Sequence, residues 1–274
     1  MVETIPQRVW TYWEQGELNA PPLVRLCLRR LRDLSQAWSV AILDSNSVRT
    51  WLPDRTIESC SSWPAQKRSN QIRLELLAKY GGVWVDPTAL LHAPFDSWIP
   101  DIPRNSVFGF KGAFPQMTVD NWLLASHPKS EAIEGLRDHH MKFFSRRRDH
   151  RPRRGGRLLL RISDKTIERN WVSSALWTIG PLSRLPVYPY FAMHYMINYM
   201  ILTRPDLIPR SHILSFPSGR DALEIQFYSR TAQAREPGSE RQALERVSSP
   251  ASKLSHHLGH PDFWRRFVEI ADKQ

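Results

Sequence analysis

Three side chains that can hold a charged ligand, Asn70, Arg73 and Asp86, stand near one another in the first third of the chain. Asn70 and Arg73 are three residues apart in a stretch with helical periodicity, so they share one face and can reach the same ligand. A guanidinium pairs with carboxylates and phosphates, and a carboxylate can hold a divalent cation. These residues therefore indicate a site for an anionic or cation-bearing ligand.

The segment that contains Asn70 and Arg73 is predicted to be a helix. Ile72, Leu76 and Tyr80 recur at intervals of four and form one apolar face. Gly81 supplies the left-handed residue that commonly ends a helix. The helix is therefore expected to stop just before the next apolar run.

Asp86 follows that apolar run directly. Residues 83–85, Val-Trp-Val, have the β-branched and aromatic content of a strand, and Pro87 forbids its continuation as a paired central strand. Asp86 should therefore lie at the carboxyl end of a buried strand, and ligands bind at such ends in open α/β sheets.

The remaining chain predicts further strands alternating with helices, which is typical of a largely parallel sheet covered on both faces. The predicted strands are residues 8–13, 38–44 and 106–110. The predicted helices are residues 22–34, 47–52, two pieces of 121–144 separated by His127-Pro128, 168–177, 190–202 and 261–271. The polar span 231–249 is predicted to be a surface linker that returns the C-terminal segment to the site.

The composition agrees with a globular protein that has a sizeable core. The 274 residues contain no apolar run close to the ~20 that cross a bilayer, and the N-terminus lacks the order of a signal peptide. A cytoplasmic location is therefore expected. Cys27 and Cys60 fit neither a metal cluster nor a disulfide framework and are expected to be reduced thiols.

The net charge of +11 is concentrated in residues 146–157, RRRDHRPRRGGR, which read as a loop or arm because they contain proline and paired glycines. One interpretation is a solvated linker; another is docking to anionic lipid headgroups or to a pyrophosphate-linked acceptor. Nucleic-acid recognition is disfavoured because no helix-turn-helix, zinc-finger or RNA-binding motif accompanies the arginines.

Three motifs carry a resemblance to a known family. They are Ser69-Asn70-Gln71-Ile72-Arg73 with Tyr80-Gly81-Gly82 and Asp86-Pro87-Thr88, residues 5–16 (IPQRVWTYWEQG), and residues 250–255 (PASKLS). In this order the chain resembles the bacterial capsular polysaccharide synthesis family of glycosyltransferases, related to the glycosyltransferases with a DxD sugar-binding region. Asn70 stands where that wider group usually has Asp, and Thr88 where the motif has its second Asp.

The resemblance implies an α/β fold of GT-A type, a Rossmann-like sandwich with a mostly parallel central sheet and added helices. It implies one glycosyltransferase domain over residues 1–274: a nucleotide-sugar-binding core at 1–110, acceptor-side helices and the basic loop at 111–230, and a linker with a C-terminal active-site segment at 231–274. The expected reaction moves a hexose or N-acetylhexosamine from a nucleotide-diphosphate donor to a capsular or other surface polysaccharide, free or lipid-linked, with a retaining outcome. Peripheral contact with the inner face of the plasma membrane is compatible with this reaction.

The resemblance also implies roles for individual residues. Asp86 and Arg73 would be catalytic, and Mn²⁺ or Mg²⁺ would be held by Asp86, Thr88 and His256. The donor would be bound by residues on four segments, with Trp10 stacked on the nucleotide base, Asp44 on the ribose and Lys253 on the pyrophosphate: Trp10, Thr11, Asp44, Asn70, Arg73, Lys253 and Ser255.

Each assignment has an ordinary structural alternative. Asp86 and Asp44 can be turn carboxylates, Asn70 a helix cap and Arg73 a surface residue. Residues 253–257 can form a basic surface turn, and Trp13 competes with Trp10 as the stacking residue. 

The histidines are less informative. Zinc is disfavoured at His256, His257 and His260 because adjacent histidines do not share a helix face and no cysteine joins them. His139 and His140 are expected at the surface, and His194 either borders the acceptor pocket or lies in the core.

Two other functions stay open. The neutral residues Asn70 and Thr88 are compatible with a binding protein that descends from a transferase and has lost activity. A basic nucleic-acid-binding protein is the third hypothesis, which salt-dependent binding would support.

Overall fold

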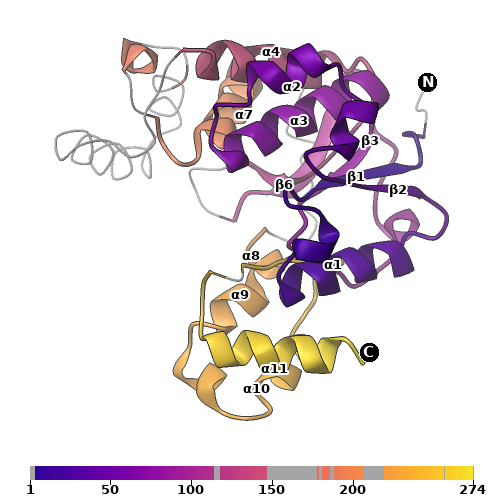
Figure 1. The fold of residues 1–274 in the computed structure, drawn as a ribbon, viewed down its shortest axis with the longest axis vertical. Helices are drawn as coiled ribbons and strands as arrows, with labels where there is room; N and C mark the ends of the chain where they lie inside the picture. The colour runs from indigo at the N-terminus through magenta and orange to yellow at the C-terminus, as the bar shows by residue number, and fades with distance from the viewer. Residues whose placement is uncertain are drawn as a thin grey trace.

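The computed structural model describes residues 4–113, 118–146, 178, 181–185, 188–206, 219–255 and 257–273. Its helices and strands form a central sheet with helices above and below it (Figure 1). The longer helices are α1 (Pro22–Asp33), α2 (Asp54–Ser59), α3 (Ala65–Tyr80), α4 (Glu131–Phe144), α7 (Ala192–Thr203), α10 (Ser239–Glu245) and α11 (Pro261–Ala271), with short α8 (Gly219–Ala222) and α9 (Glu224–Tyr228). No helix within these ranges has the length and apolar content needed to span a membrane.

The central sheet has the strand order β2-β1-β3-β6-β5. Strand β1 pairs in parallel with β2 and β3, whereas β6 is antiparallel to both of its neighbours, β3 and β5. Four of these five strands therefore point in one direction. Their bounds are β1 Arg8–Tyr12, β2 Ser39–Leu43, β3 Gly82–Val85, β5 Val107–Lys111 and β6 Val119–Ser126. The predicted α/β class and mostly parallel sheet are confirmed, while the division of the chain into functional segments stays a prediction.

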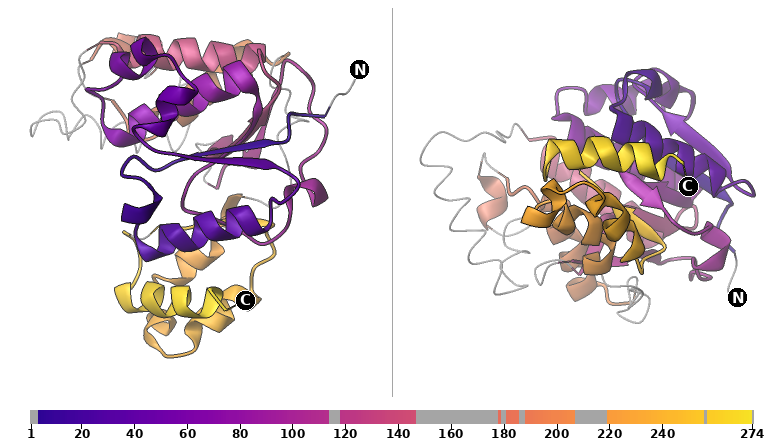
Figure 2. Two further views of the ribbon diagram at one scale, coloured as in Figure 1. Left: turned by 45° about the vertical axis from the view of Figure 1, so that its right-hand side comes forward. Right: turned by 90° about the horizontal axis from the view of Figure 1, so that it is seen from below.

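Helices cover both faces of the sheet (Figure 2). On one face α3, α4 and α7 pack against Trp10 and Trp84 of the central strands. On the other face α1 contributes Leu31 to a core with Val9, Val83 and Val85. Strand β3 is buried along its whole length, which explains why its sequence is continuously apolar and not alternating.

Helix α1 is itself a middle layer, because it lies between the sheet and the C-terminal helices. Its Leu23, Leu26 and Cys27 pack against Phe263 and Phe267 of α11. Two strands tie this C-terminal part to the sheet: β4 (Ala89–Leu91) and β7 (Ala251–Lys253) pair in antiparallel fashion. A segment far along the chain is therefore brought back to the residues that follow β3.

The turn between α3 and β3 requires its two glycines. Gly81 and Gly82 have φ angles of 65° and 91°. A Cβ on Gly82 would lie 2.3 Å from the carbonyl oxygen of Arg8, and one on Gly81 would lie 2.6 Å from the ring of Pro128. The predicted helix stop at Gly81 is confirmed, and only glycine fits such close backbone contacts at positive φ.

Two predicted elements are wrong. Residues 121–126 belong to strand β6 and not to a helix, because Leu123, Leu124 and Ala125 are buried between β3 and β5 and the backbone pairs with both strands. The span 231–249 is not a linker: it contains α10, whose Ala243 and Glu240 are buried beside α11. The predicted helix over 168–177 lies outside the described residues.

Candidate active site

The Asp86 carboxylate lies at the carboxyl end of β3 and meets Arg73 from α3. Nη2 of Arg73 is 2.6 Å from Oδ1 of Asp86, which also accepts a hydrogen bond from Nε1 of Trp84 at 2.9 Å. The Arg73 side chain is only 3% exposed, whereas that of Asp86 is 19% exposed. The surface-residue interpretation of Arg73 is therefore excluded.

Lys253 completes this charged cluster from the opposite end of the chain. Its Nζ is 2.7 Å from Oδ2 of Asp86 and 2.7 Å from Oγ1 of Thr88. The backbone fixes the approach, because Lys253 is paired with Ala89 and the Leu254 N–H donates to the carbonyl of Thr88 at 2.9 Å. Lys253 is therefore the last residue of a β-strand and contacts Asp86, so the alternative of a basic surface turn does not hold for it.

The electrostatics keep this cluster charged. Burial by itself would raise the pKa of Asp86, but the Lys253 ammonium and the Arg73 guanidinium outweigh burial and hold that pKa below its usual value. Burial lowers the pKa of Arg73 and Asp86 opposes this change. A guanidinium stays protonated under such conditions. Two cations therefore share one carboxylate, which leaves one net positive charge.

Arg73 is held rigidly in this position. Its Nη1 donates to the backbone carbonyl of Asn121 at 2.5 Å, and its guanidinium lies 4.9 Å from the centre of the Trp84 ring. Asn70, one helical turn earlier, is 4% exposed and lies in the interior of α3, which begins at Ala65. The capping role considered for Asn70 is therefore wrong.

These residues line a cavity of about 690 Å³, within the range of small-molecule sites. Its wall combines polar and charged groups with aromatic rings from the end of β1 and the start of α7. The lining residues are Tyr12, Trp13, Glu14, Gln15, Asn19, Pro21, Ala65, Gln66, Ser69, Asn70, Arg73, Asp86, Pro87, Thr88, Asn121, Tyr190, Lys253 and His257.

The assignment of Trp10 to base stacking needs correction. Trp10 is completely buried, donates through Nε1 to the carbonyl of Gly81 at 2.9 Å, and packs against Trp51 and Tyr80. Thr11 is also completely buried, and neither residue lines the cavity. A central strand is covered on both faces, so only the residues at its carboxyl end can reach a ligand.

Tyr12 and Trp13 occupy that end of β1 and line the cavity. Burial and the nearby Glu14 raise the pKa of Tyr12 to about 12, so its phenol is neutral. Sequence reasoning named Trp13 only as a competitor and missed Tyr12 and Tyr190. The position of Tyr12 at the end of the predicted strand was the signal that could have identified it.

Asp44 lies at the end of β2 but not in this cavity. Its Oδ1 accepts hydrogen bonds from the backbone N–H groups of Asn46 and Ser47, and these bonds hold its pKa below the usual value despite the opposing effect of burial. It lines a neighbouring hollow that shares Gln15 and Asn19 with the cavity. These bonds are those of an ordinary aspartate in a turn, which was the alternative to a role in binding the ribose.

The candidate site residues near the C-terminus have different outcomes. Ser255 does not line the cavity, His257 does, and His256 lies outside the described residues. For the predicted metal ligands, this leaves Asp86 and Thr88. Both already contact the Lys253 ammonium, so the arrangement of these side chains does not fit a divalent cation.

His140, expected at the surface, and His194, expected at the acceptor pocket or in the core, are both buried. His140 is completely buried and bonds through Nδ1 to Oε1 of Gln71 at 2.8 Å, so the surface expectation is wrong for it. His194 lies 3.8 Å from Asp120 through Nε2 and Oδ1. Burial lowers the pKa of His194 to about 3 and raises that of Asp120 to about 7. Between about pH 3 and pH 7 both side chains of this pair are therefore largely uncharged.

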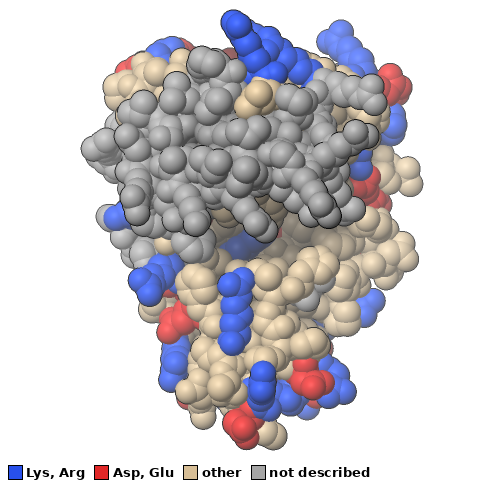
Figure 3. All heavy atoms as spheres, turned by 90° about the vertical axis from the view of Figure 1, so that its left-hand side faces the viewer, with Lys and Arg blue, Asp and Glu red and all other residues tan. Residues whose placement is uncertain are grey.

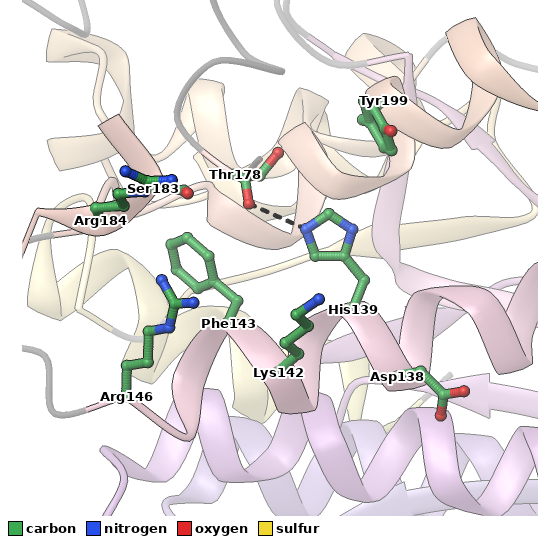
Figure 4. A pocket seen from close by; sticks show the side chains of 9 residues that line it. All are labelled: Asp138, His139, Lys142, Phe143, Arg146, Thr178, Ser183, Arg184 and Tyr199. Carbon is green, nitrogen blue, oxygen red and sulfur yellow. Dashed lines mark hydrogen bonds between the residues drawn. The ribbon is translucent and has the colours of Figure 1, made fainter. Parts of the chain in front are cut away.

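A second hollow of about 440 Å³ lies between α4, α7 and the short helix Pro181–Arg184 (Figure 4). Lys142, Arg146 and Arg184 line it and form no ion pair within the part of the chain that the structure describes. Nε2 of His139 lies 3.1 Å from the carbonyl of Thr178. The other lining residues are Asp138, Phe143, Ser183 and Tyr199. Except for Arg146, the arginine run 146–157 lies outside the described residues.

The described surface carries charges of both signs. On the face shown in Figure 3, Lys and Arg side chains lie along the top, in the middle and lower down, with Asp and Glu near them at several places. The net positive charge therefore does not form one continuous block on the described part of this face.

The sequence profile described as capsular polysaccharide synthesis protein matches residues 2–151, more than half of the chain. Glycosyltransferase afumC of Aspergillus fumigatus (strain CBS 144.89 / FGSC A1163 / CEA10) is 33% identical over 105 residues, which cover 33% of this chain and 27% of that protein. O-glycosyltransferase braB of Annulohypoxylon truncatum is 29% identical over 101 residues, covering 32% and 24%.

These matches span about a quarter of the length of the curated relatives. Among solved structures, PaToxG Glycosyltransferase resembles 77% of this chain with a TM-score of 0.38 and 13% identity, over 81% of its own chain.

Proposed function

Because the chain belongs to the capsular polysaccharide synthesis family, we propose that it is a glycosyltransferase. The proposed donor is a nucleoside diphosphate sugar, the transferred group is a hexose or N-acetylhexosamine, and the acceptor is a capsular or other surface polysaccharide. The observation that carries this proposal is the Arg73–Asp86–Lys253 cluster in the wall of the cavity.

The charge of the cluster suits a diphosphate. Arg73 and Lys253 together exceed Asp86 by one positive charge, and Lys253 is 22% exposed toward the cavity. Transfer of a sugar leaves negative charge on the departing nucleoside diphosphate, and a cation held in place beforehand stabilises that charge. The net positive charge of the cluster would therefore bind the diphosphate of the donor, and Lys253 would stabilise the nucleoside diphosphate as it leaves.

The rest of the wall suits the other parts of such a donor. Tyr12 and Trp13 offer flat apolar surfaces for the nucleotide base. Asn70 and Ser69 place an amide and a hydroxyl on the α3 side, where they can hydrogen-bond sugar hydroxyls. The wall of the cavity therefore offers separate groups for the base and for the sugar.

The carboxylates of the cavity support a retaining outcome. Asp86 is bonded to Arg73 and Lys253, and Glu14 is bonded to Arg68. Neither is a ready base for an acceptor hydroxyl, which inversion by direct attack from the opposite face would require. We therefore retain the stereochemistry that the resemblance implies.

The second hollow is our candidate for contact with an anionic acceptor or membrane surface. Lys142, Arg146 and Arg184 converge there without ion pairs to other described residues. Arg146 is the first residue of the arginine run, Lys142 lies four residues before it, and Arg184 comes later in the chain. Unpaired exposed cations attract lipid phosphates and pyrophosphate-linked saccharides. Nucleic acid is not part of this proposal.

A thermal-shift screen of nucleotide sugars, with and without Mn²⁺, tests the donor. A ligand present at 100 times its Kd adds about 2.7 kcal/mol to the apparent stability, which raises the Tm by several degrees. Nucleoside monophosphates serve as matched controls without the diphosphate. If no nucleotide sugar raises the Tm under either condition, the proposed function is wrong. A nucleotide sugar that binds but is not slowly hydrolysed would favour a binding protein that descends from a transferase and has lost activity.

A further inference from the structure

The Lys253 ammonium lies between the two polar side chains of the Asp86-Pro87-Thr88 motif. Its Nζ is 2.7 Å from Oδ2 of Asp86 and from Oγ1 of Thr88. A divalent cation bound by both side chains would have to lie between the same two oxygens. That position is filled by a cation that belongs to the chain.

The other oxygen of Asp86 and the surrounding side chains are also unsuited to a metal ion. Oδ1 of Asp86 accepts hydrogen bonds from Arg73 at 2.6 Å and Trp84 at 2.9 Å, so both carboxylate oxygens are engaged. Mg²⁺ needs near-octahedral oxygen ligands at about 2.0–2.1 Å. Within the described ranges, no group of three or more His, Cys, Asp and Glu side chains is placed to hold a metal.

Electrostatics lead to the same conclusion. Arg73 and Lys253 already exceed Asp86 by one positive charge in a partly buried site. A divalent cation would add two more positive charges next to them, and like charges repel strongly where water is scarce. The departing diphosphate, in contrast, brings negative charge to this place.

The backbone holds Lys253 on a paired β-strand. Residues 251–253 pair with 89–91, and Nε2 of His92 contacts Oγ of Ser252 at 2.9 Å on the same strand pair. An ammonium has three N–H donors, of which Asp86 and Thr88 take two. One donor is therefore available to a ligand in the cavity.

We propose that Lys253 takes the place of the divalent cation and makes sugar transfer independent of metal. The inference rests on the proposed function. In the step, the bond between the anomeric carbon and the diphosphate oxygen breaks, and its electron pair passes to that oxygen. A new bond forms between the anomeric carbon and the acceptor oxygen, whose proton leaves on the nucleoside diphosphate. Lys253 donates a hydrogen bond to the diphosphate as its charge grows.

The first test compares metal and donor binding by the wild-type protein. Mn²⁺ alone is titrated and followed by electron paramagnetic resonance, and the nucleotide sugar found by thermal shift is titrated in EDTA. We expect that Mn²⁺ does not bind stoichiometrically. We also expect that EDTA changes neither the affinity for the donor nor the rate of donor hydrolysis. Donor binding that requires Mn²⁺ overturns the metal-free role of Lys253 while the proposed function stands; absence of binding under both conditions overturns the function itself.

The second test removes the ammonium. Lys253→Gln should lower kcat by roughly 10²- to 10³-fold, as loss of one donor to a developing oxyanion does in other enzymes. Lys253→Arg keeps the charge and should recover part of this loss. The control Lys273→Gln removes an equal charge from an exposed position in another part of the surface and should leave kcat unchanged.

The pattern of rescue decides between a cation role and a structural role. A cation role predicts that Lys253→Arg regains part of the activity that Lys253→Gln lacks. Added Mn²⁺ should stimulate neither the wild type nor Lys253→Gln, because Oδ1 of Asp86 stays bonded to Arg73 and Trp84; stimulation of either would overturn the metal-free role. If Lys253→Gln keeps wild-type kcat in EDTA, Lys253 does not assist departure. If the variant does not fold by circular dichroism, the EDTA comparison on the wild type decides the question.

Discussion

The cavity at the end of β3 and the hollow beside α4 differ in how their cations are held. In the cavity at the end of β3, Arg73 and Lys253 share the Asp86 carboxylate, and the Arg73 side chain is 3% exposed. In the hollow beside α4, the lysine and arginines are exposed and form no ion pair with a described residue. Paired, buried cations are fixed in geometry, whereas exposed, unpaired cations contribute mainly long-range attraction. The first arrangement suits a chemical step and the second suits docking.

The largest effect is expected from Asp86→Asn, which leaves Arg73 and Lys253 without their shared counterion. Breaking a buried pair on one side costs about 3–5 kcal/mol, and displacement of the two cations should lower kcat by roughly 10²- to 10³-fold. Urea unfolding and donor hydrolysis measure the two effects. Asp54→Asn, in the exposed pair with Arg49, is the control and should change neither. Near wild-type activity in Asp86→Asn would show that the cluster is not catalytic.

A smaller loss is expected from Arg73→Lys. The substitution keeps the charge but loses the planar fork that contacts Asp86 and the carbonyl of Asn121. Loss of a hydrogen bond to a charged group corresponds to about 1.5–3 kcal/mol, or roughly 10- to 100-fold in kcat/KM for the donor. Steady-state kinetics check this value, with Arg49→Lys as the matched surface control. Unchanged donor kinetics would remove Arg73 from the donor site.

The exposed hollow should behave differently. Replacement of Lys142, Arg146 and Arg184 by Gln should weaken binding to anionic vesicles by about 1 kcal/mol for each cation near the surface. Slow donor hydrolysis should stay unchanged. High salt should mimic the triple variant because a Debye length of about 10 Å at 0.1 M screens exposed charges.

A second triple variant serves as its control: Arg55, Arg235 and Lys273, all exposed and elsewhere on the surface, are replaced by Gln. Vesicle cosedimentation separates the two variants. An equal loss of binding in both would mean that only the net charge matters. If replacing Lys142, Arg146 and Arg184 abolishes nucleotide-sugar binding, this hollow belongs to the donor site. The proposed difference between a catalytic cavity and a docking hollow would then be wrong.

The last expected effect concerns stability and pH at Asp120, a residue of β6 that lies beside His194 of α7. Burial raises its pKa to about 7 in the folded protein. The folded state therefore holds the proton at pH values where the unfolded chain releases it, so the contribution of Asp120 to stability should decrease as pH rises from about 4 to about 7. The slope is at most about 1.4 kcal/mol per pH unit for one proton.

Urea unfolding at pH 5 and pH 8 checks this expectation. Asp120→Asn should lose less stability than the wild type between these values, while the exposed control Asp101→Asn should follow the wild type. A wild-type difference that Asp120→Asn does not reduce would mean that Asp120 is ionised in the folded protein at both values.

Local sequence signals predicted one side of the cavity. Asn70, Arg73 and Asp86 were found because helix spacing, a glycine stop and a short apolar strand fix their order over a few residues. Lys253 entered only through the resemblance, because the β4–β7 pairing that delivers it joins segments far apart in the chain. Such long-range pairing leaves no periodic signal in a single sequence.

The wrong predictions have the same origin. Residues 122–125, Trp-Leu-Leu-Ala, are apolar without alternation, so their period does not distinguish a buried helix from a central strand; the pairing with β3 and β5 decides. Trp10 has the chemistry of a stacking platform, but its place inside a strand covered on both faces makes it a core residue. The tertiary neighbours decided each case.

A crystal structure with a bound nucleoside diphosphate, grown with Mn²⁺ present, would show whether Lys253 or a metal ion meets the diphosphate. We expect a diphosphate oxygen within hydrogen-bond distance of Nζ of Lys253, the base against Tyr12 or Trp13, and no metal ion between Asp86 and the diphosphate. A manganese ion coordinated by Asp86 and the diphosphate, with Lys253 displaced, or a nucleotide bound outside this cavity, would contradict this expectation.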